Sequence, residues 1–189
     1  MVAVTQTLST WGGNFYVSKG LGFLYNDHFR GGRGGTGYGS MLPLMRSSST
    51  SVPTLVFAPD GQPRLAVGAA GNAWIPASVY DIILNVIDGG MDAQRAIEAP
   101  RLLVVRDPAD PAASRVQIED RIPRSILLDL TARGHRFQKI GRKGEVRYGY
   151  AAAAAVDVER RQVQGGAEPR RSHAAVAVAP AATSPGDRR

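Results

Sequence analysis

The chain has 189 residues, of which 43% are hydrophobic and 21% charged, so it is long enough to bury one sizeable core and is not disordered overall. It contains no cysteine, which excludes a disulfide framework, a thiolate metal site and a cysteine nucleophile. The formal net charge is +7, but residues 53–132 are net acidic and most basic residues are arginine, a bias that a GC-rich genome produces without selection for phosphate binding.

The first part of the chain is predicted to consist of strands and loops. The alternation in Val2-Ala3-Val4-Thr5 predicts a strand that starts without a preceding turn or cap, so we expect the chain to be truncated at this end. Residues 30–39, RGGRGGTGYG, have too little apolar surface to fold alone and predict a loop. Residues 54–58 and 64–68 predict a β-hairpin, because Pro59-Asp60-Gly61-Gln62 supplies turn chemistry between them.

The second part is predicted to alternate helices with strands. Apolar residues at helical spacing from Ile75 to Ile87 predict a helix that ends at Gly89-Gly90. A short helix over 92–98 has Asp92 near its start and is stopped by Pro100. The remaining predicted elements are strands over 102–105, 116–118 and 148–156 and a helix between Pro123 and Gly134. Beyond Asp157 the chain becomes polar, and the Ala/Pro/Arg-rich residues 179–189 predict a disordered tail.

A glycine turn over 68–72 connects a predicted strand to a predicted helix. Such a turn presents backbone N–H groups at the positive end of the helix, where they can bind phosphate or stabilise an oxyanion. The turn lacks the P-loop spacing and a lysine, which argues against a nucleoside triphosphate. From these residues alone, a tight connection that needs glycine is the simpler interpretation.

The other candidate motifs are weaker. The hydroxyls of residues 47–51 have no GxSxG context, and His28, His135 and His173 lack metal-ligand spacing, so we expect no metal site. Residues 30–39 are similar to arginine–glycine tracts that bind single-stranded nucleic acid, but only Tyr38 is interleaved, which favours a loop. No serine–histidine–acid combination can be assembled from this sequence.

The order of the segments resembles the small subunit of the γ-glutamyltransferases from residue 1 to about 178. The most specific similarities are AVTQTLS at 3–9, DAQRAIEAPR at 92–101 and AEPRR at 167–171. The resemblance implies one domain over 1–178 and an α+β fold that forms half of an αββα N-terminal nucleophile hydrolase sandwich, with stacked, mainly antiparallel sheets flanked by helices. It implies acyl transfer or amide hydrolysis, with a γ-glutamyl compound such as glutathione as donor, and no cofactor.

The same resemblance implies roles for several hydroxyl groups and for the glycine turn. Thr7 matches the threonine whose hydroxyl assists the nucleophile, and Ser9 matches a polar position of the donor site. Ser49 and Thr50 match the paired hydroxyls that hold the substrate carboxylate. Gly71 and Asn72 match the glycine pair whose N–H groups form the oxyanion hole.

The sequence also departs from the family pattern. The nucleophilic threonine of the family lies just upstream of the VAVT strand, so we expect a chain that begins at Met1 to lack it and to be inactive alone. His28 and Gly31 stand where the family has an amide and an acid that bind the donor α-amino group. Because a buried ammonium without a partner costs several kcal/mol, another amide or acyl donor, as in the related acylases, remains open.

Three interpretations follow for function. The first is one side of an acyl-transfer site, with the large subunit or missing N-terminal part as partner and a small amide or peptide as substrate. The second is a non-catalytic basic module that binds nucleic acid through residues 30–39 and 133–147, which the charge distribution disfavours. The third is a pseudoenzyme subunit.

The compartment stays open at this level. No stretch approaches the roughly 20 consecutive apolar residues that span a bilayer, so no membrane span is predicted. Residues 1–5 lack the basic region and apolar run of a secretory signal. The resemblance implies that relatives are often periplasmic or secreted.

Overall fold

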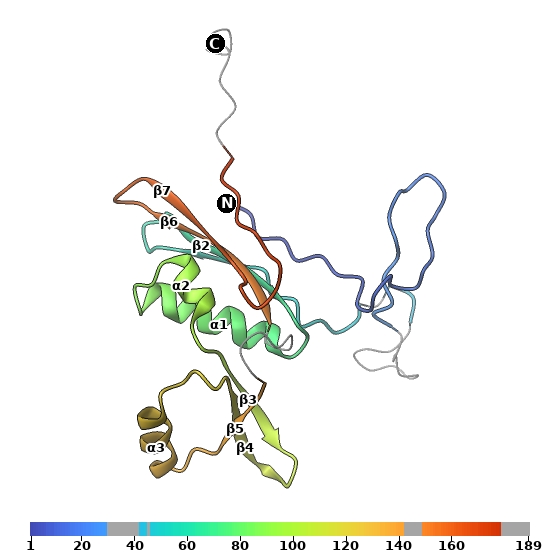
Figure 1. Cartoon of the computed structure of the whole chain (residues 1–189). Helices are drawn as coiled ribbons and strands as arrows, with labels where there is room; N and C mark the ends of the chain where they lie inside the picture. Colours follow the sequence, from blue (N-terminus) through green and yellow to red (C-terminus); the bar gives the residue numbers. More distant parts are fainter. Residues whose placement is uncertain (30–41, 45, 142–148, 179–189) are drawn as a thin grey trace.

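The computed structural model describes residues 1–29, 42–44, 46–141 and 149–178. Its main layer is an antiparallel sheet in the order β1-β2-β6-β7. Two helices cover one face of this sheet (Figure 1). The elements of this layer are β1 (Thr54–Phe57), β2 (Pro63–Ala70), α1 (Trp74–Ile87), α2 (Ala93–Glu98), β6 (Tyr150–Asp157) and β7 (Gln162–Ala167).

The hydrophobic core lies between the sheet and the two helices. Alternate side chains of β2, such as Leu65 and Val67, face the helices and are at most 1% exposed. The alanines of β6 that pair with them leave room for Ile82 of α1, which is fully buried. Gly166 of β7 lies so close to α2 that an added Cβ would be 2.6 Å from the Ala93 carbonyl oxygen. Small residues in β6 and β7 therefore let the helices approach the sheet closely.

A smaller unit lies beneath α1 (Figure 1). It consists of a three-stranded sheet in the order β3-β4-β5 and one helix, and β5 pairs with β4 in parallel. None of the side chains of the helix is fully buried, so this unit adds little to the core. The elements are β3 (Leu102–Asp107), β4 (Asp110–Ile118), α3 (Arg124–Ala132) and β5 (Phe137–Lys139).

Most predicted elements are confirmed. The hairpin, the helix over 75–87 and the helix before Gly134 are present at close to their predicted bounds. The short helix α2 begins after Asp92, whose carboxylate accepts a hydrogen bond of 2.8 Å from the Arg95 N–H. The predicted loop over 30–39 and the predicted tail over 179–189 lie outside the described residues.

The prediction of a strand at the N-terminus is wrong. Residues 2–7 are extended but belong to no sheet in the described part of the chain, because alternation alone supplies no hydrogen-bonded neighbour. The reverse error occurs at β5 and β7, which the sequence analysis did not predict. Residues 162–167, QVQGGA, have weak strand propensity, and pairing with β6 decides their conformation.

Candidate functional site

The strand register brings three segments to one end of the main sheet. Ala70, the last residue of β2, pairs with Tyr150, the first residue of β6. Thr54, the first residue of β1, pairs with Val67 near the end of β2. Because all three strands are antiparallel to their neighbours, the segments before β1 and β6 and the turn after β2 meet where α1 begins. We call this the turn end of the sheet (Figure 1).

The Gly71–Asn72 turn at this end has an unusual backbone. Gly71 has φ of 123° and Asn72 has φ of 57°, both in the region that favours glycine. The Gly71 and Asn72 carbonyls accept hydrogen bonds from the N–H groups of Trp74 (3.2 Å) and Ile75 (3.0 Å). Among the residues that the structure describes, nothing accepts a hydrogen bond from the N–H of Gly71 or Asn72. Two adjacent donors at a helix N-terminus can stabilise an oxyanion.

Gly71 has no room for a side chain. An added Cβ would be 2.8 Å from the Cα of Gly149 and 2.9 Å from its nitrogen. Gly149 directly precedes β6, so the backbones on either side of the turn touch. Glycine at position 71 therefore follows from the close approach as well as from φ.

The hydroxyl residues Thr7 and Ser9 lie in a second group. Thr7 is exposed, and its Oγ1 accepts a hydrogen bond of 3.0 Å from the Ser9 N–H. The Asp27 carboxylate accepts hydrogen bonds from the N–H of Thr10 (3.0 Å) and from its hydroxyl. The Asp27 N–H donates to the Leu8 carbonyl at 3.1 Å. Asp27, which the sequence analysis did not select, thus holds residues 8–10 in place, and no sequence motif marks it.

Ser49 and Thr50 are exposed and lie a few residues before β1. The Ser49 Oγ accepts a hydrogen bond of 3.0 Å from the Ser51 N–H, which fixes the local turn. Val52, the residue after Ser51, packs against the core and anchors the segment. Ser49 and Thr50 therefore lie near the turn end of the sheet, because β1, which follows them in the chain, begins there.

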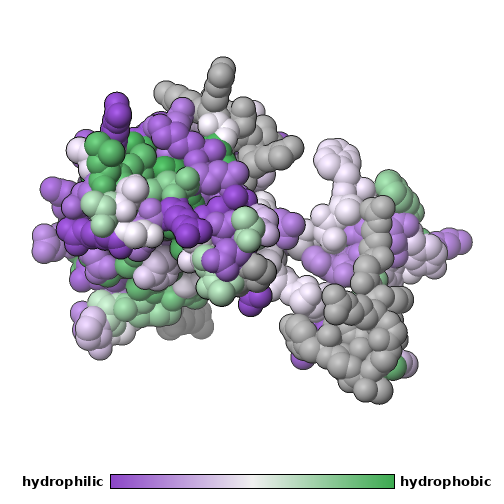
Figure 2. Space-filling model, turned by 90° about the horizontal axis from the view of Figure 1, so that it is seen from below, coloured by the Kyte–Doolittle hydropathy of each residue, from purple (hydrophilic) through white to green (hydrophobic). Residues whose placement is uncertain are grey.

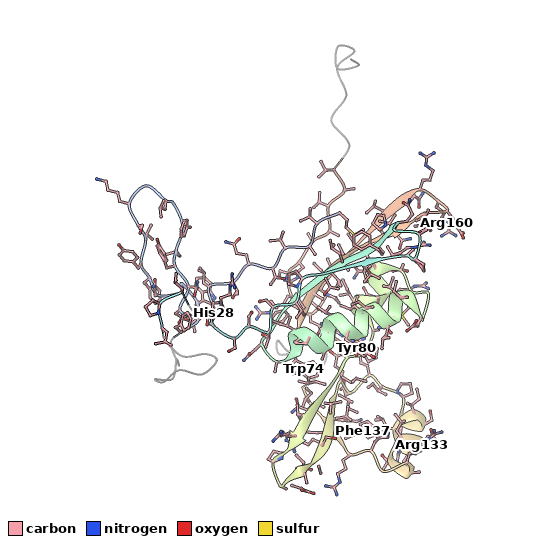
Figure 3. All side chains as sticks on the ribbon, turned by 180° about the vertical axis from the view of Figure 1, so that it is seen from behind. His28, Trp74, Tyr80, Arg133, Phe137 and Arg160 are labelled. Carbon is pink, nitrogen blue, oxygen red and sulfur yellow. The ribbon has the colours of Figure 1, made fainter. Side chains whose placement is uncertain are left out.

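His28 is half-buried in a segment that stands apart from the sheet. Its backbone N–H donates to Asn26 Oδ1 at 3.1 Å. Figure 3 shows His28 in this separate group and Trp74 at the start of α1. A hollow of about 580 Å³ lies beside His28, lined by Thr10, Gly13, Asn14, Phe15, Asn26, Asp27 and Phe29. Gly31 lies outside the described residues.

The predicted site residues thus form three groups. Thr7 and Ser9 lie near Asp27 and His28, Ser49 and Thr50 precede β1, and the Gly71–Asn72 turn follows β2. No hydrogen bond joins these groups in the described part of the chain. Each group is attached to a different segment near the turn end of the sheet.

The sheet face opposite the helices carries a long hollow of about 890 Å³. Its floor is made of small residues, including Gly68, Ala152 and Gly165. Residues 2–6 and 173–178 run along it: an added Cβ at Gly68 would be 3.1 Å from Thr5 Oγ1, and one at Gly165 would be 2.9 Å from Ala175 Cβ. We call this surface the open face.

Residues 10–29 and 42–44 project beyond the turn end as a separate lobe (Figures 1 and 2). Large apolar side chains in this lobe are exposed, the most so including Trp11 at 98% and Phe15 at 79%. Soluble proteins rarely leave such side chains grouped in water unless they contact a partner. Among the described residues, nothing covers these side chains of the lobe.

A buried charged cluster lies behind the turn end, and the sequence analysis did not identify it. Arg101, Glu119, Glu168 and Arg170 are each at most 8% exposed. Arg170 Nε and Nη2 donate to the two oxygens of Glu119 at 2.6 and 2.8 Å, and Arg170 Nη1 donates to Glu168 Oε1 at 2.8 Å. Arg101 Nη2 contacts Glu168 Oε2 at 2.8 Å. The sequence carries a signal for this cluster, because Arg101 and Arg170 lie in the two motifs DAQRAIEAPR and AEPRR.

The cluster shifts the pKa values of its members. Burial favours the neutral form of Glu168, but the charge of Arg101 and the hydrogen bond from Arg170 outweigh it and lower the pKa of the carboxyl. Burial lowers the pKa of Arg101, and the nearby charge of Glu168 opposes this effect. The pKa of Arg170 is raised, because hydrogen bonds to Glu119 and Glu168 outweigh its burial. Glu168 and Arg170 are therefore both ionised at neutral pH.

Neither a metal centre nor a membrane-spanning helix is present among the described residues. They contain no group of three or more His, Cys, Asp and Glu side chains that could hold a metal ion. No helix among them is long and apolar enough to cross a membrane.

The mixed α+β arrangement matches the N-terminal nucleophile hydrolase fold of γ-glutamyltranspeptidases. A solved γ-glutamyltranspeptidase mutant from Pseudomonas nitroreducens superposes with a TM-score of 0.70 at 23% identity, over 95% of this chain and 93% of that chain. The sequence model of the family described as gamma-glutamyltranspeptidase matches residues 1–178. The chain belongs to this family, whose members are processed two-subunit enzymes.

Curated relatives include two kinds of enzyme. A glutathione hydrolase proenzyme of Bacillus subtilis (strain 168) is 31% identical over 75% of this chain and 22% of its own length. An acylase ACY 1 proenzyme of Pseudomonas sp. (strain V22) is 28% identical over 72% of this chain and 23% of its own length. The chain spans about a fifth of the length of the glutathione hydrolase proenzymes that it matches. Family membership supports acyl transfer or amide hydrolysis as the type of reaction.

Proposed function

We propose that this chain forms one side of an acyl-transfer site in a larger enzyme that transfers or hydrolyses the acyl group of an amide. The observation that carries the proposal is the Gly71–Asn72 turn at the start of α1, whose two N–H groups donate to no acceptor among the described residues. Segments that bear hydroxyl groups lie before β1 and directly before the lobe, next to the same end of the sheet. Donors fixed before the reaction are well suited to a charge that develops on a carbonyl oxygen.

In the proposed reaction, a threonine supplied outside these 189 residues attacks the carbonyl carbon, and its free amine takes the hydroxyl proton. The N–H groups of Gly71 and Asn72 stabilise the resulting oxyanion. The C–N bond then breaks, and the leaving amine takes up that proton. Water or a second amine attacks the acyl ester and completes the reaction. Thr7 assists the nucleophile, Ser9 borders the donor, and Ser49 and Thr50 hold the donor carboxylate.

The donor is the part of the proposal that the sequence departures affect most. A γ-glutamyl donor such as glutathione carries an α-ammonium group, and His28 and Gly31 supply no carboxylate for it. We therefore propose an amide whose acyl part has a carboxylate but need not have an α-ammonium group. A matched pair of substrates, a γ-glutamyl amide and a glutaryl amide, tests this, because they differ only in that amino group. At least tenfold higher kcat/KM for the γ-glutamyl amide would contradict the proposal.

The proposed partner is the large subunit of the same family, or an N-terminal part of the same polypeptide. Two observations support a partner: the open face is incompletely covered, and Trp11 and Phe15 are exposed in the lobe. Nucleic acid is not supported, because two of the described arginines in the basic stretch 133–139 pair with acids. Arg133 contacts Asp129 at 3.1 Å, and Arg136 contacts Asp107 at 3.5 Å.

The experiment is to express the complete reading frame from the source organism and to measure amide hydrolysis and acyl transfer. We expect turnover from the complete protein, and a roughly 100-fold lower kcat for Gly71→Ala, because its Cβ collides with Gly149 and misplaces the donors. Thr7→Ala should also lower kcat with little change in folding. Gly61→Ala is the control, since Gly61 has positive φ but no atom within 4 Å of an added Cβ. A complete, folded protein without turnover would leave the pseudoenzyme interpretation.

A further inference from the structure

Arg101 is a fully buried cation with partners on three sides. Its side chain is 1% exposed. Its Nη1 donates to the Gly149 carbonyl, and its Nη2 donates to the Ile97 carbonyl at 3.0 Å and contacts Glu168 Oε2 at 2.8 Å. A buried charge is tolerated only with such partners, so each contact restricts its neighbour. Arg101 therefore fixes the position of the Gly149 carbonyl.

Gly149 is held between the first turn of α1 and Gly71. It has φ of 49°, and an added Cβ would be 2.8 Å from the Trp74 carbonyl oxygen and would collide with the Ser78 hydroxyl. Gly149 also lies against Gly71, because a Cβ added to Gly71 would be 2.8 Å from the Gly149 Cα. Gly149 is thus hydrogen-bonded to Arg101 and lies against Gly71. A shift of Gly149 must therefore move Gly71 or the start of α1.

The buried cluster supports Arg101 in this position. Glu168 Oε2, which pairs with Arg101, also accepts a hydrogen bond of 3.1 Å from the Ala151 N–H. Arg101 and Glu168 thus hold the backbone on both sides of Tyr150, where β6 begins. Glu168 is in turn bound by Arg170.

We propose that Arg101 is a positioning residue for the oxyanion turn, acting through Gly149 on the N–H groups of Gly71 and Asn72. Arg101 does not touch the substrate: it prevents Gly149 from retreating, so that the two donors keep the geometry that the transition state requires. This inference rests on the proposed function of the turn. A misplacement of about 1 Å can lower a rate roughly 100-fold, so the effect belongs in kcat and not in KM.

The test compares Arg101→Lys and Arg101→Gln with Arg95→Gln in the complete protein. Arg95 lies six residues away in α2 and is 80% exposed, so it controls for loss of an arginine in the same segment. Lysine retains the charge beside Glu168 but lacks the fork that reaches Gly149 at the same time. We expect both Arg101 variants to lower kcat roughly 30- to 100-fold with KM changed less than threefold, and Arg95→Gln to leave both constants unchanged. An equal change in KM, or full kcat in Arg101→Lys, would overturn the proposal.

A second readout does not depend on turnover. We expect hydrogen–deuterium exchange of Arg101→Lys to increase in peptides that contain residues 71–75 and 149–151, and to stay unchanged in β3 and β4. Unchanged exchange at the turn would refute the proposal even if activity is lost, and so would failure of Arg101→Lys to fold, which would assign Arg101 to folding alone. If the wild-type protein shows no acyl transfer, the proposed function fails, whereas the exchange result still decides whether Arg101 positions the turn.

Discussion

The two faces of the main sheet are built from the same strands but differ in what covers them. On the helix side, Leu65 and Ile82 are fully buried and the core is complete. On the open face, Ala152 and Gly68 line a hollow, and Val163 is 72% exposed. The helix side therefore holds the sheet together, whereas the open face is where we propose that another part of the protein packs.

A charge on the open face should have the largest effect, and it should act on assembly. Ala152→Glu places a carboxylate where the proposed partner packs, and an unpaired buried charge costs about 3–5 kcal/mol. We expect co-purification of the partner to be lost while the helical content of this chain is retained. The measurement is pull-down with circular dichroism of the captured chain. Normal assembly of Ala152→Glu would mean that the open face is not the docking surface.

Removal of a core side chain on the helix side should have the next largest effect, and it should act on folding. Leu65→Ala leaves a cavity beneath α1 and is expected to lower the free energy of unfolding by about 2–4 kcal/mol. Val163→Ala on the open face is the matched control, with an expected change within about 0.5 kcal/mol in the uncomplexed protein. Urea denaturation measures both. Equal effects of the two variants would remove the distinction between the faces.

A smaller effect on stability, which depends on pH, is expected for Asp81 of α1. This residue joins the core layer to the smaller unit through its hydrogen bond with Leu102. Burial raises the pKa of its carboxyl from 3.8 to about 6, partly offset by a hydrogen bond from the Leu102 N–H. A raised pKa contributes stability below pH 3.8, which is lost as the pH rises through 6. Asp81→Asn should therefore raise stability at pH 7 by about 1–2 kcal/mol, since some solvent contact reduces the cost. Denaturation at pH 4.5 should show a smaller gain in the free energy of unfolding for Asp81→Asn. A loss of stability in this variant at pH 7 would contradict a raised pKa of Asp81.

The smallest effect is expected for the exposed arginine of α3. Arg133 and Asp129 are 68% and 61% exposed, and such a pair contributes at most about 0.5 kcal/mol. Arg133→Ala should leave both the unfolding midpoint and the partner affinity unchanged. Thermal denaturation at low and high salt checks this. A large destabilisation would show that the smaller unit depends on surface charge.

Local patterns in the sequence were sufficient for the helices, the first hairpin and the family. Each of these features depends on a few neighbouring residues, so the local sequence predicts them directly. Examples are the apolar spacing from Ile75 to Ile87, the cap at Asp92 and the turn at Asp60-Gly61. The glycine turn was also visible as a strand followed by a helix. These features need no knowledge of what lies elsewhere in the fold.

Tertiary structure decided the rest, because the contacts join residues far apart in the chain. Residues 162–167 form a strand despite their glycines because they pair with β6. Residues 2–7 form no strand because they pair with no other strand among the described residues. The ion pairs of Arg101 with Glu168 and of Arg170 with Glu119 span more than 50 residues each. A charged residue looks solvent-exposed in a sequence, and only the fold shows that it is buried, paired and aimed at Gly149.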